Sequence, residues 1–359
     1  MSKYWSKLAA SLTPYVPGEQ PKDQRYIKLN TNENPYPPSP KAIEAIRKAA
    51  NDELRLYPDP TCDDLRTAIA KRHGLTKEQI FVGNGSDEIL AFAFPAFFSP
   101  ERPILFPDVT YTFYPVYAKF YGIPYETVQT DNEFLINPDD YMNPNGGIVI
   151  PNPNAPTARY LIVDELERIL RANEDTVVIV DEAYIDFGGR SAVSFINDYP
   201  NLLVVQTLSK SRSLAGLRVG MAFGHPDLIE GLNRVKDSFN SYTLDRLALA
   251  GAMAAIEDEA YFEETTRKVM ATRERTAKAI AELGFVSIPS SANFLFVTHP
   301  EISAELLFGR LKSKGILVRY FNKPRIDRYL RVSIGTDEEM DQFAKALADI
   351  AEEAGRIDQ

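Results

Sequence analysis

The chain lacks most features that mark secreted, membrane or nucleic-acid-binding proteins. It has one cysteine, Cys62, so no disulfide can form within it and a reducing compartment fits. No apolar run reaches the roughly 18 residues of a membrane span, and no signal-peptide stretch follows Met1. The formal net charge is -10, with acids and bases interspersed and no long basic run. These absences predict a soluble cytoplasmic protein that binds neither membrane nor nucleic acid.

The 359 residues exceed one average domain, and the pattern along them changes twice. Residues 1–40 end in a proline-rich stretch that excludes helix and central strand, which predicts an N-terminal arm. Over residues 41–240, apolar runs of strand length alternate with helical patterns, which favours a large domain with a mostly parallel sheet covered on both faces. Residues 241–359 predict a smaller α+β domain, entered through a long helical stretch over 244–283. The predicted strands of the large domain are 104–106, 147–150, 177–180, 202–206 and 219–223.

Polar residues that follow the predicted strands are the first candidates for a site, because ligands of parallel α/β sheets bind beyond the carboxyl ends of strands. Four apolar residues precede Asp181, and Tyr184 follows three positions later. Asp181 is as easily read as a helix N-cap as the partner of a pyridinium nitrogen. Tyr184 is as easily a packed tyrosine as a hydrogen-bond donor to the same ring.

Lys210 follows the next predicted strand after Thr207, Leu208 and Ser209. Most lysines lie on solvated surfaces, but one placed just after a buried strand is partly desolvated, which suits imine chemistry. Arg218 comes eight residues later, before another apolar strand.

The segment Phe81–Glu88 predicts a strand, a glycine-containing turn and the start of a helix. Free backbone N–H groups at a helix N-terminus bind anions, although Ser86 as a plain N-cap explains the pattern almost as well. A phosphate held by Gly85, Ser86, Ser209 and Arg218 accounts for all four residues at once.

Taken together, these segments resemble a known family. Asp181–Tyr184, Thr207–Lys210 and Leu214–Arg218 have the order and spacing found in fold-type I pyridoxal-phosphate (PLP) aminotransferases. Further segments are similar to the histidinol-phosphate aminotransferase family within that group, and the resemblance extends from about Tyr15 to Leu347. These segments are Pro14–Gly18, Asn30–Pro35, Leu56–Asp59, Gly83–Glu88 and Leu330–Thr336.

The resemblance implies PLP as the cofactor and assigns it a set of residues. Lys210 is expected to hold the cofactor as a Schiff base and to shuttle a proton, with Asp181 on the ring nitrogen and Tyr184 on the phenolic oxygen. Tyr111 is expected to stack on the ring, and Tyr57 to reach the cofactor phosphate of the neighbouring subunit in a homodimer. The phosphate and its surroundings are assigned to Gly85, Ser86, Asp87, Thr207, Ser209 and Arg218.

The resemblance also implies two small-molecule substrates, an amino donor and a 2-oxo acid. Arg331 is expected to bind their anionic groups as a planar fork. Residues expected to assist it are Tyr15, Asn32 and Arg319.

One segment departs from the family. Where the family often has Asn-Asn-Pro-Thr-Gly, this chain has Asn154-Ala155-Pro156-Thr157-Ala158. Ala155 cannot donate the hydrogen bond to the cofactor's phenolic oxygen. Either Asn154 replaces it through a backbone shift, or Tyr184 serves that oxygen alone.

The implied activity is transamination between histidinol phosphate and 2-oxoglutarate in histidine biosynthesis. An aromatic amino acid aminotransferase and a PLP-dependent decarboxylase of a phosphorylated amino acid remain open, because the motifs do not fix the chemistry that follows cofactor loading. A non-catalytic PLP-binding protein is a third alternative. The three histidines lack metal-ligand spacing, so no metal site is expected.

Overall fold

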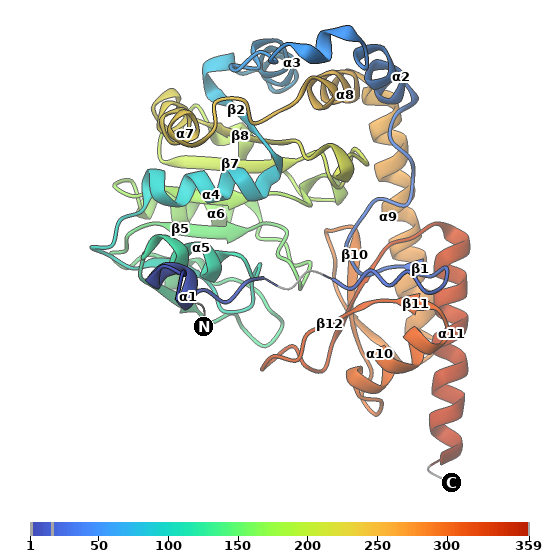
Figure 1. The fold of residues 1–359 in the computed structure, drawn as a ribbon. Coiled ribbons are helices and arrows are strands. Elements are labelled where there is room, and N and C mark those ends of the chain that lie inside the picture. Colours follow the sequence, from blue (N-terminus) through green and yellow to red (C-terminus); the bar gives the residue numbers. More distant parts are fainter. Residues whose placement is uncertain (1–2, 16–17, 358–359) are drawn as a thin grey trace.

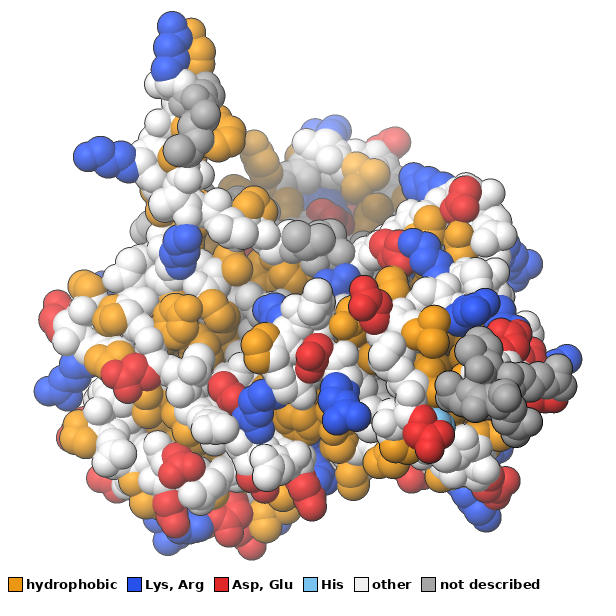
Figure 2. Space-filling view, turned by 90° about the horizontal axis from the view of Figure 1, so that it is seen from below, with side chains coloured by type: hydrophobic (Ala, Val, Ile, Leu, Met, Phe, Trp, Pro, Cys, Tyr) orange, Lys and Arg blue, Asp and Glu red, His pale blue; other side chains and the backbone are white. Residues whose placement is uncertain are grey.

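The computed structural model of the chain describes residues 3–15 and 18–357. Residues 1–2, 16–17 and 358–359 lie outside the described residues, and they include Val16 and Pro17 of the first matched segment. A large seven-stranded sheet lies between two layers of helices, and a small four-stranded sheet packs on further helices beside it (Figure 1). On the face that Figure 2 shows, acidic and basic side chains are interspersed, as they are in the sequence. Within the described ranges, no helix is long and apolar enough to cross a bilayer.

The large sheet has the strand order β2-β8-β7-β6-β5-β3-β4. Its central strands β5, β6 and β7 are parallel and fully buried, as their continuous apolar runs predict. β8 is antiparallel to both of its neighbours, so the sheet is mostly but not wholly parallel. The strands are β2 (Ile80–Gly83), β3 (Ile104–Pro107), β4 (Tyr125–Val128), β5 (Ile148–Pro151), β6 (Val178–Asp181), β7 (Leu202–Thr207) and β8 (Gly220–Gly224).

Alternating side chains of the strands other than the edge strand β4 fill two separate cores, one on each face of this sheet. On β6, Val178 and Val180 join one core while Ile179 joins the other. The first core is covered by α2 (Pro40–Ala49), α3 (Asp63–His73), α6 (Val163–Ala172) and α8 (Arg246–Glu257). The second is covered by α4 (Gly85–Phe97), α5 (Tyr114–Tyr121) and α7 (Pro226–Phe239).

The small sheet has the order β12-β13-β10-β9 and is antiparallel throughout. Most of its apolar side chains share a third core with the helices before and after it in the chain, and β1 (Ile27–Lys28) pairs with β11 (Ile316–Leu317) beside it. The remaining strands are β9 (Val286–Ile288), β10 (Phe294–Thr298), β12 (Arg319–Tyr320) and β13 (Leu330–Ser333). The remaining α-helices are α1 (Lys7–Ser11), α9 (Glu259–Ala281), α10 (Ala304–Ser313) and α11 (Asp337–Ile357).

The prediction of a single long helix over 244–283 is wrong, because the chain forms two helices that are separated by a break at Asp258. The Asp258 carboxylate accepts hydrogen bonds from Ser39 Oγ and, at 2.8 Å, Lys41 Nζ, which ties the break to the start of α2. α8 packs on α2 and α3 against the large sheet, whereas α9 runs on to the small sheet (Figure 1). The domain boundaries at residues 40 and 240 stay a prediction.

Candidate active site

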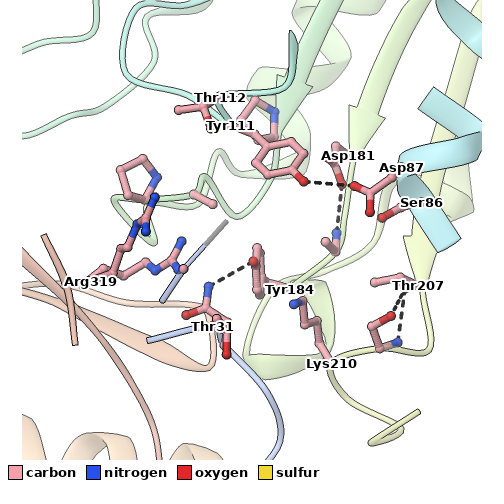
Figure 3. Close-up of a pocket in the computed structure, with 18 of the residues that line it drawn as sticks. Thr31, Ser86, Asp87, Tyr111, Thr112, Asp181, Tyr184, Thr207, Lys210 and Arg319 are labelled. Carbon is pink, nitrogen blue, oxygen red and sulfur yellow. Dashed lines mark hydrogen bonds between the residues drawn. The ribbon is translucent and has the colours of Figure 1, made fainter. Parts of the chain in front are cut away.

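A cavity of about 250 Å³ opens where the carboxyl ends of β5, β6 and β7 meet the start of α4, the chain around residues 30–33 and the small sheet. Figure 3 shows side chains from these separate elements turned toward one space. The structure therefore brings together residues that lie more than three hundred positions apart. The residues predicted from the sequence that line it are Tyr15, Asn32, Ser86, Asp87, Tyr111, Asp181, Tyr184, Thr207, Ser209, Lys210, Arg218, Arg319 and Arg331.

Asp181 is the last residue of β6 and is only 6% exposed. Its carboxylate accepts hydrogen bonds from the hydroxyl of the buried Tyr114 at 2.8 Å and from the backbone N–H of Ala183 at 3.3 Å. Burial raises the pKa of Asp181 to about 6, because the charged form has lost most of its water. No α-helix begins at this residue, so the N-cap interpretation does not hold. A buried carboxylate that faces a cavity is suited to pair with a cationic group there.

Lys210 lies in the turn after β7, and its ammonium is 5.8 Å from the centre of the Tyr184 ring. The Lys210 backbone carbonyl accepts a hydrogen bond from Asn34 Nδ2 at 3.0 Å, so the arm before α2 fixes the lysine's main chain. Figure 3 shows the lysine nitrogen directed toward Tyr184 and the interior of the cavity. The main chain of Lys210 is therefore fixed, while its side-chain amine faces the cavity.

The opposite part of the cavity is built around the start of α4. Asp87 accepts hydrogen bonds from Tyr111 Oη at 2.9 Å and from Arg218 Nη2 at 3.0 Å. Asn84, not Ser86, is the N-cap residue, and its side chain makes no capping bond. The helix therefore keeps first-turn N–H groups for an anion, with Ser86 and Arg218 beside them.

Glycine is favoured at position 85 chiefly by its backbone conformation, and also by the guanidinium that lies against it. Its φ of +79° lies in the left-handed region, and a Cβ here would come within 2.5 Å of Arg218 Nη2. The backbone of Gly85 itself is not a lining residue of the cavity, but it lets Arg218 lie directly over the helix start. Across the strand, Gly220 permits the same close approach, since its Cβ would lie 2.5 Å from the Gly85 carbonyl carbon.

Arg331, on β13, provides the positive end of the cavity that faces the small sheet. Its Nη2 donates to the backbone carbonyl of Asn30 at 3.0 Å, and its guanidinium lies 5.5 Å from the ring centres of Phe294 and Phe321. Its Nε is buried and has no hydrogen-bond partner within the described part of the chain. Burial lowers the pKa of Arg331. A buried guanidinium with an unused donor is a site for an anion.

Three predicted residues do not line the cavity. Gly85 lies just behind Arg218, as described above. Asn154 is buried, and its Nδ2 donates to the Val109 carbonyl at 2.8 Å, while Ala155 occupies the cavity wall. Tyr57 is 77% exposed and stacks on Tyr242, with 4.6 Å between ring centres.

Among the lining residues that the sequence did not single out, Phe321 and Glu33 bear most on the charge of the cavity. Phe321 lies between Arg319 and Arg331, 5.5 Å from each guanidinium, and its position two residues after Arg319 was the available signal. Glu33 also lines the cavity, where it bonds to Lys28 Nζ at 2.7 Å and to Thr31 Oγ1 at 2.8 Å. It lies inside the matched segment Asn30–Pro35, so the motif contained it.

The histidines and the cysteine have structural surroundings. Burial lowers the pKa of His73 to about 4, and His225 Nδ1 caps α7. Burial raises the pKa of the Cys62 thiol to about 11, which disfavours a reactive thiolate. Among the described residues, no group of three or more His, Cys, Asp or Glu could hold a metal ion.

Comparison with known proteins agrees with this geometry. The sequence model of the family "Aminotransferase class I and II" matches residues 24–347. Histidinol-phosphate aminotransferase from Clostridium acetobutylicum is 59% identical over 343 residues, which cover 96% of this chain and 97% of that protein. The protein of the same name from Clostridium beijerinckii is 58% identical and covers 97% of each chain.

The structure is similar to that of histidinol-phosphate aminotransferase from Sinorhizobium meliloti in complex with pyridoxal-5'-phosphate. The TM-score is 0.89 at 26% identity, and the match covers 99% of both chains. The predicted fold class, fold type I with a mostly parallel large sheet and a smaller α+β part, is confirmed.

Proposed function

This chain belongs to the class I and II aminotransferase family, and from that premise we propose that it transfers the amino group of histidinol phosphate to 2-oxoglutarate, with PLP as its cofactor. The products are imidazole acetol phosphate and glutamate, and the reaction belongs to histidine biosynthesis. The identity of 59% with a histidinol-phosphate aminotransferase, over 96% of the chain, supports the substrate. The single observation that carries the chemistry is the cavity in which Lys210, Asp181 and Arg331 meet.

The residues of the cavity fit PLP. When bound, PLP supplies an electron-accepting ring that stabilises negative charge at the substrate carbon. Asp181 would hold the ring nitrogen, since a cation beside a buried carboxylate stabilises its charged form and so offsets the cost of burial. Tyr184 would donate to the phenolic oxygen, and Tyr111 would stack on the ring. The phosphate would lie at the start of α4 among Ser86, Ser209 and Arg218, with Thr207 bonded to Ser209 behind it.

The remaining side chains perform the work of binding and proton transfer. The Lys210 amine is in position to take a proton from the substrate carbon and return it, because its main chain is fixed by Asn34. Arg331 binds the anionic end of either substrate with the guanidinium that lines the cavity, and Arg319 and Tyr15 line the same region. One arginine site thus serves a phosphate ester and a carboxylate in turn.

The enzyme is expected to prefer histidinol phosphate to histidinol by about 10⁴-fold in kcat/KM, because removal of the phosphate leaves the buried guanidinium without its partner.

Arg331→Lys keeps the charge and loses the planar fork, so kcat/KM for both histidinol phosphate and glutamate should fall by about 10- to 100-fold. Steady-state kinetics on the purified enzyme measure both effects.

Arg310→Lys is the matched control, since Arg310 lies half-exposed on α10 away from the cavity and should leave kcat/KM unchanged. Equal turnover of histidinol, or of phenylalanine, would contradict the proposed substrate. Turnover of phenylalanine at the rate of histidinol phosphate would favour an aromatic aminotransferase. Release of CO₂ from a phosphorylated amino acid would favour a decarboxylase. If the protein binds PLP but turns over none of these substrates, a non-catalytic PLP-binding protein would be favoured.

We also propose a cytoplasmic homodimer with shared active sites. Tyr57 and Tyr242 form an exposed aromatic pair, and Phe239 nearby in sequence is 80% exposed. Arg246 Nη2 donates to the Tyr57 backbone carbonyl at 3.1 Å, which fixes the main chain at this exposed residue. Tyr57 in this position can serve the cofactor phosphate of a partner subunit. The single buried cysteine fits the cytoplasm.

Tyr57→Phe is expected to weaken PLP binding by about 10- to 100-fold, the effect of one hydrogen bond to a charged group. Mixing this variant with Lys210→Ala subunits should then restore activity, because a shared site leaves each heterodimer with one site that has neither defect. Activity and bound PLP of the mixture, after subunit exchange, measure this. If mixing does no more than dilute the two variants, Tyr57 acts within its own subunit or not at all.

A further inference from the structure

Asn32 lies at the meeting point of the arm, the small sheet and the cavity. It is 1% exposed and has a φ of +56°, a left-handed conformation that asparagine adopts more readily than most residues. It lines the cavity together with Tyr184. The left-handed conformation explains why an asparagine is tolerated here, but not why both ends of its side-chain amide form hydrogen bonds.

The small sheet fixes both the main chain and the side-chain amide of Asn32. The Asn32 N–H donates to Ser333 Oγ at 2.8 Å, and the Ser333 hydroxyl donates to Asn32 Oδ1 at 3.0 Å. Asn293 Nδ2 donates to the Asn32 carbonyl at 2.9 Å. The single hydrogen of the Ser333 hydroxyl is thus used on Asn32 Oδ1, which sets the orientation of the amide.

The other end of that amide reaches Tyr184. Asn32 Nδ2 donates to Tyr184 Oη at 3.0 Å. An amide nitrogen can only donate, so the phenol oxygen accepts in this bond and its own hydrogen is left for another acceptor. No second partner of the Tyr184 hydroxyl is found among the described residues, and Tyr184 lines the cavity.

We propose that Asn32 is a positioning residue that makes Tyr184 a hydrogen-bond donor toward the phenolic oxygen of the cofactor. Ser333 orients the Asn32 amide, the amide occupies the acceptor side of the Tyr184 hydroxyl, and the Tyr184 hydrogen points into the cavity. The inference rests on the proposed PLP-dependent function. It assigns Asn32 to the cofactor's electronics, whereas the sequence resemblance placed it among substrate contacts.

Asn32→Asp tests the direction of the bond. Aspartate has nearly the same shape and also tolerates the left-handed conformation, but its carboxylate only accepts hydrogen bonds. The Tyr184 hydrogen should therefore turn to the introduced carboxylate and away from the cofactor. A hydrogen bond donated to the phenolic oxygen stabilises its ionised form, so loss of that bond makes the bound cofactor hold its proton to higher pH.

The measurement is the pH titration of the absorbance of bound PLP in the purified holoenzyme. Asn32→Asp should raise the apparent pKa of the cofactor by about 1 to 2 pH units, and Tyr184→Phe should do the same. Asn32→Gly keeps the backbone conformation and removes the amide that orients the Tyr184 hydroxyl without adding an acceptor, so it should raise the apparent pKa by less than Asn32→Asp does. An unshifted titration in Asn32→Gly would mean that Tyr184 donates without help from Asn32 and would overturn the positioning role.

A double variant separates hydrogen-bond direction from the added negative charge. If direction matters, Asn32→Asp should add little to the shift of Tyr184→Phe, because the hydroxyl it acts through is gone. An equal and additive shift in the double variant would overturn the proposal in favour of charge alone. An unshifted titration in Asn32→Asp would overturn it in favour of a purely structural role.

Ser333→Ala provides a second route if Asn32→Asp does not fold. Without the serine hydroxyl the amide can turn over, so a smaller upward shift is expected, and an unshifted titration would overturn the proposal. A wild-type protein that binds no PLP would overturn the proposed function itself and this inference with it, whereas the outcomes above overturn the inference alone.

Discussion

Lys210→Ala is expected to lower the rate of transamination by about 10⁴-fold or more while the protein stays folded. The substitution removes the amine that would carry the cofactor and move the proton. It leaves the Lys210 backbone carbonyl in place, so the hydrogen bond from Asn34 is kept. Turnover and thermal unfolding of the purified variant measure both parts of this expectation.

Lys210→Arg is the matched variant, because it keeps a positive charge in the cavity and cannot form a Schiff base. It should be about as inactive as Lys210→Ala and should still bind PLP without a covalent bond. If Lys210→Arg retains most of the activity, the residue contributes charge only and the covalent role is wrong.

Asp181→Asn is expected to lower kcat by about 10² to 10⁴-fold, the range for removal of one partner of a buried charge pair. Asparagine has the shape of the aspartate and can still accept from Tyr114, so the loss is that of the charge opposite the cofactor ring. Asp181→Ala should be at least as damaging, because it also leaves the Tyr114 hydroxyl without its partner.

Glu182→Gln is the control for a buried carboxylate next in sequence. Glu182 is 1% exposed, and burial raises its pKa to about 7. Its oxygens accept from Ser191, Ala192 and Gln206, and it is not a lining residue of the cavity. This variant should change stability and keep kcat. A near-normal kcat in Asp181→Asn would mean that Asp181 is a structural acceptor for Tyr114.

Asp181→Asn should also change how the stability of the cofactor-free protein depends on pH. The pKa of Asp181 is raised from 3.8 to about 6, so the folded state holds a proton that the unfolded chain has released between these values. The stabilisation from that proton is complete below about pH 3.8 and is lost as the pH rises through about 6. The difference in Tm between wild type and Asp181→Asn should therefore change across this window and stay constant above it.

The main elements of the large sheet follow from the sequence because short continuous apolar runs that alternate with helical patterns favour buried parallel strands. The same runs predict that Asp181 and Lys210 stand at neighbouring strand ends, and the cavity brings them together. The α4 start was predicted from its glycines and polar residues, although the N-cap proved to be Asn84. The sequence alone was therefore enough to place residues that directly follow a strand, because such residues lie at the carboxyl end of that strand.

Other features depend on tertiary contacts that no local pattern contains. The break at Asp258 is held by Ser39 and Lys41, over two hundred residues earlier in the chain. The direction of the bond from Asn32 to Tyr184 depends on Ser333, which reaches it from the small sheet. The effect of Ala155 in place of the family asparagine also required the structure, which places Ala155 on the cavity wall and turns the Asn154 amide to Val109.

The most direct test is borohydride reduction of the holoenzyme, followed by peptide mapping, with and without prior addition of histidinol phosphate. Without substrate, reduction should fix PLP on the peptide that contains Lys210. After histidinol phosphate is added in the absence of a 2-oxo acid, the amino group has moved to the cofactor and the label on Lys210 should disappear, whereas histidinol should leave it in place. A label on another lysine, or a Lys210 label that histidinol phosphate does not remove, would contradict the account.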